Sequence, residues 1–160
     1  MFFLIMLLLL SKTIQSEEID TRPEYVSVLL YHRFGESKYP STNISPELFR
    51  KQLEFLRQEN YTVLHLDQFR NVVHGQTSFP KKSVLITIDD AYRSIYDHAF
   101  PILKEFNFPF TLFVDARPLS SGALGAMTWE MLQEMREWGA SVGNHTYSHA
   151  RIGRPKYNQN

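Results

Sequence analysis

The chain has 160 residues, with 17 basic and 17 acidic side chains and no cysteine. Apolar residues make up 43% of the sequence and charged residues 21%, which is typical of a globular domain rather than a disordered chain. The balanced charge offers no basic footprint, so we expect no nucleic-acid partner. The absence of cysteine excludes a disulfide framework and a thiolate metal site.

Nine consecutive apolar residues, Phe2 to Leu10, follow the first methionine. A membrane-spanning helix needs about 20 such residues, so we expect no stable membrane span. The run suits the core of a secretory signal peptide, with Ser16 as the small residue before cleavage, although no Lys or Arg precedes it. We expect residues 1–16 to be a signal peptide of a periplasmic or extracellular protein. The alternative is a buried strand or helix of the domain.

Residues 17–24 are polar and form an expected linker, after which short apolar strands alternate with amphipathic helices. The first strand is mostly apolar, as expected for a central parallel strand covered on both faces. Pro101 lies inside a helical pattern and predicts a kink or a late helix start. Residues 118–127 are expected to be a Gly/Ser loop. The expected strands span 26–31, 61–64, 83–88, 110–114 and 140–143, and the expected helices span 45–60, 67–73, 94–106 and 128–138.

This alternation predicts an α/β fold, in which a parallel sheet is connected by right-handed crossovers and the helices lie outside. Polar side chains follow most of the strands. Because the carboxyl ends of parallel strands share one edge, they should lie along a single rim, where such folds place their active sites. These residues are His32, the pair Asp89 and Asp90, Asp115 and His145.

The two adjacent aspartates and a pair of histidines suggest a metal site. Neighbouring carboxylates repel each other unless a cation lies between them or one keeps its proton. His145 and His149 are four residues apart, which would place both on one face of a helical turn. One carboxylate and two imidazoles suit zinc or another late first-row divalent metal rather than calcium. Two adjacent aspartates alone are more often a helix cap, and two histidines at this spacing are more often surface or capping residues. Because both patterns follow predicted strand ends, a catalytic metal site is favoured.

Such a site is suited to hydrolysis of an amide or ester without a covalent intermediate. One aspartate would bind the metal and the other would accept a proton from water. The sequence contains no nucleophile elbow, phosphate loop or dinucleotide fingerprint that would favour another chemistry.

Two segments resemble the first two motifs of the polysaccharide deacetylase family, also called the NodB-homology family or carbohydrate esterase family 4. They are Thr87-Ile88-Asp89-Asp90-Ala91-Tyr92 and His145-Thr146-Tyr147-Ser148-His149. The strand before His32 is also similar to the family's first strand, and the resemblance extends over residues 24–155. It implies an incomplete (β/α) barrel that removes N-acetyl groups from a polysaccharide containing N-acetylglucosamine.

The resemblance also implies roles for individual residues. Asp89 would be the general base. Asp90, His145 and His149 would bind a divalent metal, for which zinc is the favoured ion. We expect three neighbours to line the pocket: His32, Tyr92 and Asn144.

The sequence departs from the family pattern in several places. Ile88 replaces Phe and Ala91 replaces Gly within the first motif. The family's later Arg, which orients the base, and its later His, which acts as the acid, have no counterpart, because only eleven residues follow His149. We therefore expect residues 25–160 to form a C-terminally incomplete deacetylase domain. The alternatives are an amidase acting on a small amide and a truncated, non-catalytic glycan-binding or relic protein. The oligomeric state stays open.

Overall fold

The computed structural model describes residues 25–150 of the chain. The predicted signal peptide over residues 1–16 and the predicted linker over residues 17–24 lie outside the described residues. Among residues 25–150, no helix is both long enough and apolar enough to cross a membrane.

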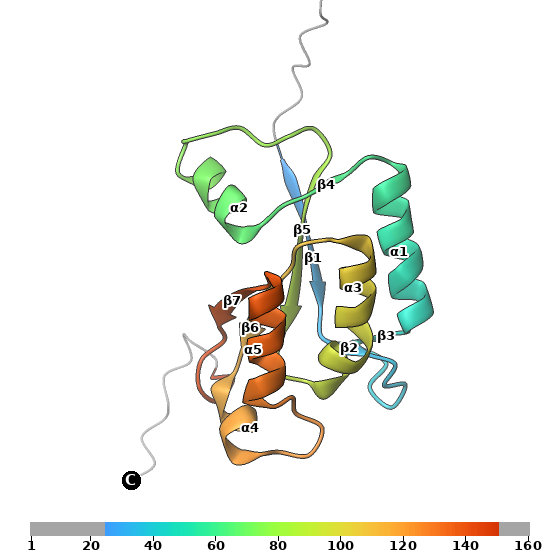
Figure 1. Ribbon diagram of the computed structural model, residues 1–160, viewed down its shortest axis with the longest axis vertical. Coiled ribbons are helices and arrows are strands. Elements are labelled where there is room, and N and C mark those ends of the chain that lie inside the picture. The colour runs from blue at the N-terminus through green and yellow to red at the C-terminus, as the bar shows by residue number, and fades with distance from the viewer. Residues whose placement is uncertain (1–24, 151–160) are drawn as a thin grey trace, which may run out of the picture.

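A parallel sheet of five strands forms the centre of the described chain (Figure 1). The central strand β5 pairs with β1 along one edge, with β4 and β6 along the other, and β7 extends the sheet beyond β6. The predicted α/β class with parallel strands is therefore confirmed. The strands are β1 (Val26–Tyr31), β4 (Thr62–Val63), β5 (Ser83–Asp89), β6 (Thr111–Val114) and β7 (Ser141–Asn144).

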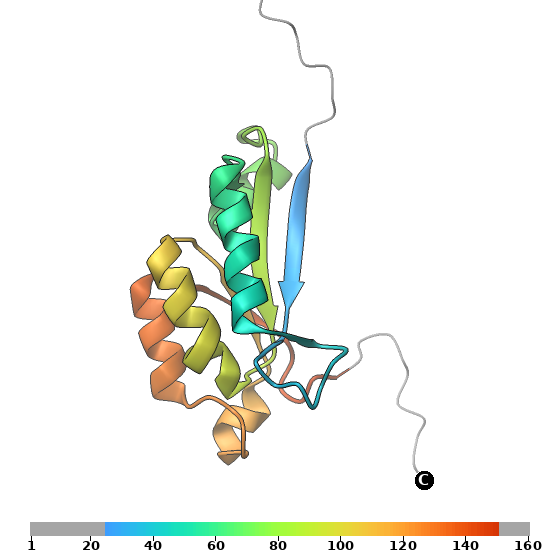
Figure 2. The ribbon, with the colours of Figure 1, turned by 90° about the vertical axis from the view of Figure 1, so that its right-hand side faces the viewer.

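Three helices, α1, α3 and α5, form one layer against the sheet, as Figure 2 shows. Ser45 and Thr128 cap α1 and α5 as predicted, because their side-chain oxygens accept the backbone N–H groups of the third helical residues. The helical elements are α1 (Pro46–Gln58), α2 (Leu66–Val73), the π-helix η1 (Ile95–Ala99), α3 (Phe100–Phe106), α4 (Ala116–Ser121) and α5 (Trp129–Trp138).

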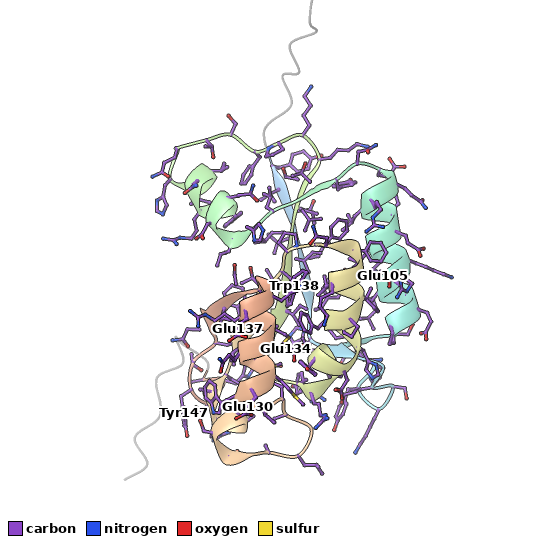
Figure 3. The ribbon with its side chains drawn as sticks, viewed as in Figure 1. Glu105, Glu130, Glu134, Glu137, Trp138 and Tyr147 are labelled. Atoms are coloured by element: carbon purple, nitrogen blue, oxygen red, sulfur yellow. The ribbon has the colours of Figure 1, made fainter. Side chains whose placement is uncertain are left out.

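The core lies between this helical layer and the sheet, and aromatic side chains fill much of it. The ring of Trp138 packs 5.8 Å from that of Phe100 and 6.0 Å from that of Phe110, centroid to centroid (Figure 3). At the surface, Arg50 of α1 forms two hydrogen bonds with Glu105 of α3. These contacts fix the helices relative to the sheet, and so fix the strand ends that carry the polar residues.

The helix predicted over residues 94–106 contains the π-turn η1 near its start and continues as α3. The backbone N–H of Phe100 donates to the carbonyl of Ile95, five residues earlier. Pro101, the next residue, has no N–H to donate. The irregular turn therefore lies where the regular series of helical hydrogen bonds is already interrupted. The expected late start is wrong, because residues 93 and 94 are already helical, and the irregularity in this helix is the π-turn.

The prediction that β1 is covered on both faces is wrong for the described part of the chain. Within residues 25–150, β1 is an edge strand, and Val28 and Leu30 are about half exposed, at 52% and 55%. An apolar hollow runs between this strand and α1, where Phe55 and Tyr61 also line it. None of the predicted site residues lines the hollow, so it is separate from the candidate chemistry.

Two further elements differ from the sequence-based expectation. Residues 116–121, partly expected as loop, form the short helix α4, which ends at Gly122 in the left-handed region with φ of 62°. Pro118 is compatible with this helix, because the first helical residues need no N–H donor. Between the expected strand 26–31 and the expected helix 45–60, where no strand was predicted, the structure has a parallel pair of two-residue strands, β2 (Arg33–Phe34) and β3 (Asn43–Ile44).

Gly143 allows β7 to approach β6 closely. A Cβ atom at this position would lie 2.5 Å from Cδ1 of the Phe113 ring, closer than any van der Waals contact allows. We expect Gly143→Ala to destabilise the fold by about 1–3 kcal/mol, because an extra methyl must displace the ring. Urea unfolding monitored by circular dichroism checks this. The double variant with Phe113→Leu should recover much of the loss, and a Gly143→Ala chain as stable as the original would contradict the contact.

Candidate metal centre

The two aspartates reach the same rim because the chain turns sharply after β5. Asp89 is the last residue of the strand, and Asp90 follows with φ of 71°, in the left-handed region that Asp tolerates better than most residues. The N–H of Asp90 donates to the carbonyl of Phe113 on β6, at 2.9 Å. This turn breaks the alternation of side chains along the strand, so both carboxylates approach the same imidazole.

The histidines lie in a turn after β7 that is not helical, so the predicted helical turn is wrong. Thr146 and His149 have φ of 67° and 54°, which no right-handed helix contains. The side-chain oxygen of Asn144 accepts the N–H of Thr146 at 2.6 Å, and the Thr146 hydroxyl accepts the N–H of Ala150 at 2.7 Å. These side-chain bonds compete with a helical ladder and replace it. Tyr147, labelled in Figure 3, lies within the same turn.

Three predicted ligands nevertheless converge. One ligand atom from each of Asp90, His145 and His149 lies within 4.8 Å of the others. The Nε2 atoms of His145 and His149 are 3.5 and 3.6 Å from the same Asp90 oxygen, Oδ1. Both distances are long for hydrogen bonds, and the buried Nε2 of His145 has no hydrogen-bond partner.

The two distances to Oδ1 of Asp90 fit a shared ion. Two ligand atoms that each lie about 2.0–2.1 Å from a tetrahedral ion are separated by about 3.4 Å. A carboxylate and two imidazoles form the kind of ligand set that leaves a fourth position open for water or substrate. The donor set and its spacing therefore suit zinc or a similar divalent metal.

Asp89 lies beside this cluster without belonging to it. Its Oδ2 atom is 3.8 Å from Nε2 of His145, and its side chain is partly buried. Burial raises the pKa of Asp89 above its ordinary value, and the nearby imidazoles of His145 and His32 oppose that rise. A carboxylate with a raised pKa is a stronger base than an ordinary Asp once it is ionised.

The three residues expected to line the pocket take different positions. His32 lies close enough to Asp89 for its charge to act on that carboxyl. Tyr92 interacts with Asp90, whose negative charge adds to the effect of burial and raises the Tyr92 pKa. Asn144 is exposed, and its side chain holds the histidine turn through the N–H of Thr146.

The sequence-based reasoning gave no role to Arg33, which lies beside the pocket. Its guanidinium carbon is 3.4 Å from the centre of the Tyr92 ring and 3.9 Å from that of Tyr39. Arg33 also pairs with Glu36 at 2.6 Å, and Glu36 accepts a hydrogen bond from Ser94. Arg33 therefore packs against the Tyr92 ring, a role that only its position after the first strand could have suggested.

The fold and the site together define a parallel α/β protein with a candidate metal centre at the carboxyl ends of its strands. Residues 76–159, just over half of the chain, match the family model for polysaccharide deacetylases. The chain belongs to the polysaccharide deacetylase family.

Three similar proteins illustrate this membership. The poly-β-1,6-N-acetyl-D-glucosamine N-deacetylase of Staphylococcus epidermidis is 29% identical over 132 residues, covering 80% of this chain and 44% of that protein. The solved structure of IcaB from Ammonifex degensii is 36% identical, with a TM-score of 0.72, over 79% of this chain and 55% of that one. The Streptococcus pyogenes deacetylase PplD, solved in complex with acetate, is 26% identical, with a TM-score of 0.72, over 81% of this chain and 59% of that one.

The chain spans about half the length of the curated relatives it matches. The residues matched by the family model, 76–159, include both the aspartates and the histidines. The later Arg and His that the family resemblance implies would lie beyond the second motif, outside the described residues.

Proposed function

We propose that this chain provides the metal-binding and proton-accepting residues of a deacetylase that hydrolyses N-acetyl groups on an N-acetylglucosamine polysaccharide. Family membership supports the reaction class. The substrate class is supported by a relative, the poly-β-1,6-N-acetyl-D-glucosamine N-deacetylase of Staphylococcus epidermidis. The structural observation that carries the proposal is the convergence of three ligand atoms within 4.8 Å, with the separate carboxylate of Asp89 beside them.

The ligand set would hold one divalent ion, for which we propose zinc. When bound, such an ion acts as a Lewis acid toward a carbonyl oxygen and makes water more acidic. Asp90, His145 and His149 would hold it, since their ligand atoms already face one another. Among residues 25–150, these three form the cluster with the right mixture of carboxylate and imidazole.

Asp89 would act as the general base. Its carboxylate would take up the proton of the water that attacks the acetyl carbonyl, and its raised pKa strengthens it for this task. Release of the amine requires a proton donor, which the resemblance assigns to a His beyond the described residues.

The decisive experiment is an assay of acetate release by the natural protein, including any sequence that its gene encodes beyond Asn160. The substrates are β-1,6-linked N-acetylglucosamine oligomers, chitin oligomers and a small linear amide. We expect acetate from a glycan, loss of turnover on chelation, and recovery with zinc. Turnover of the small amide alone would favour the amidase. Glycan binding without acetate release would favour the non-catalytic alternative.

We also propose that the protein is exported, on the basis of the apolar run Phe2 to Leu10 and the small residue Ser16. Intact-mass analysis of the secreted or periplasmic protein should show a chain that begins at Glu17. A mature cytoplasmic protein that still begins at Met1 would contradict this proposal.

A further inference from the structure

A third carboxylate, that of Asp115, lies next to the candidate metal centre. Asp115 directly follows β6, the strand between the one that carries the aspartates and the one that leads to the histidines. Backbone hydrogen bonds fix its position from both sides. The carbonyl of Val114 accepts the N–H of His145 at 3.0 Å, and the N–H of Arg117 donates to the carbonyl of Tyr147 at 2.8 Å. Asp115 is thus held against the turn that contains both histidines.

The Asp115 side chain is buried and incompletely paired. The residue is 7% exposed, and its Oδ1 atom has no hydrogen-bond partner among the described residues. A buried carboxylate oxygen without a partner is costly, and most such groups in native proteins are hydrogen-bonded. Asp115 is the N-cap residue of α4, but its side chain makes no capping hydrogen bond. Helix capping therefore does not account for this carboxylate.

The orientation of the histidines offers a partner for it. Both rings direct Nε2 toward Oδ1 of Asp90, which leaves the Nδ1 atom of each ring outside the ligand cluster. A histidine that binds a metal through one ring nitrogen almost always donates its other N–H to a carboxylate, a backbone carbonyl or water. The free oxygen of Asp115 is an acceptor of this kind, located at the correct strand end.

We propose that Asp115 is a positioning residue of the metal centre, whose free oxygen accepts the Nδ1–H of His149 while Nε2 of that ring binds the metal. This inference rests on the proposed metal site but not on the proposed substrate. His149 is the more exposed of the two histidines, at 58% against 27% for its side chain. Packing therefore restrains the ring of His149 less than that of His145. A hydrogen bond to Asp115 would fix its orientation.

The electrostatics of the site agree with this assignment. Burial and the negative charge of Asp90 raise the pKa of Asp115, while His149, and less strongly His145, oppose the rise. Two buried carboxylates in one site repel each other, and a divalent cation held between Asp90 and the histidines would relieve the repulsion.

The test is the affinity of the 160-residue chain for zinc, measured by competition with a chromophoric chelator. Asp115→Asn keeps an acceptor but loses the charge, and Asp115→Ala loses both. We expect Asp115→Ala to weaken zinc binding about 10–100-fold, the usual loss for a partner of a metal-binding histidine, and Asp115→Asn to weaken it less. Both variants should also shift the visible bands of bound Co²⁺, which a purely structural role would leave unchanged.

Asp97→Asn is the matched control, because Asp97 is an exposed acid paired with Arg93 at 3.1 Å on η1, away from the metal cluster. It should leave zinc affinity and the Co²⁺ spectrum unchanged. Zinc affinity of Asp115→Ala within twofold of the unsubstituted chain, with the same Co²⁺ spectrum, would overturn the proposal.

A measurement on the unsubstituted chain keeps the proposal testable if the Asp115 variants do not fold. In the zinc-loaded chain, nitrogen-15 NMR should show His149 metallated at Nε2, with an Nδ1–H that exchanges slowly with water. Metal on Nδ1, or a rapidly exchanging N–H, would overturn the role of Asp115. Neither result depends on acetate release, so failure here and failure of the proposed deacetylase activity are separate outcomes.

Discussion

Replacing either histidine of the candidate site by alanine is expected to abolish stoichiometric zinc binding. The unsubstituted chain should retain one zinc per molecule after dialysis, whereas His145→Ala and His149→Ala should retain almost none. The reason is geometric, because each Nε2 atom is one of only three ligand atoms that face one another in the cluster. Two remaining ligands are fewer than the three protein ligands that catalytic zinc sites use.

Metal content by atomic emission, with thermal unfolding in parallel, would test this prediction. A ligand that binds only the folded state raises its stability, so zinc should raise the unfolding midpoint of the original chain and not of either variant. His74→Ala is the control, because His74 is an exposed histidine at the end of α2, outside the cluster. Full zinc content in both site variants would show that the ion, if bound, uses other residues.

The strand that carries the aspartates could be predicted from the sequence because its signal is local. Residues 83–88 are mostly apolar and rich in β-branched side chains, and two acidic residues follow them. The structure buries all six of these residues. The helices with Ser45 and Thr128 as caps were predictable for the same reason, since a cap and a periodic apolar face lie within a few residues.

The covering of a strand could not be predicted in this way. β1 has the apolar composition of a central strand, yet Val28 and Leu30 are about half exposed within the described chain. Composition reports what a strand can bury, whereas its neighbours in the sheet decide what it does bury. The requirement for glycine at position 143 could not be predicted either. A side chain there would clash with the ring of Phe113, which lies on another strand.

The candidate ligands were predictable as a set, but the backbone that presents them was not. A four-residue spacing between histidines is compatible with a helical turn, and here the side chains of Asn144 and Thr146 hold a different turn. The position of Asp115 at a strand end was visible in the sequence. Its burial and its unpartnered oxygen, which give it a role, required the assembled rim.

The two neighbouring aspartates are expected to behave differently when each is replaced by asparagine. Asp90 faces both imidazoles through one oxygen, at 3.5 and 3.6 Å, whereas Asp89 lies 3.8 Å from His145 alone. Asp89→Asn should therefore keep the metal and lose turnover, because an amide cannot accept the proton from water. General acid–base catalysis typically contributes about 10²–10⁴-fold, so the loss in kcat should fall in this range. Asp90→Asn should weaken metal binding as well as turnover.

The comparison requires zinc content and acetate release to be measured on the same samples of the natural protein. Saturating zinc separates the two roles, because it should restore part of the activity of Asp90→Asn and none of that of Asp89→Asn. Asp67→Asn serves as the control, since Asp67 lies on α2 and is 83% exposed. If Asp89→Asn lost the metal while Asp90→Asn kept it, the roles of the two carboxylates would be exchanged. The sharp turn at Asp90, with its φ of 71°, would then present the base and not the ligand.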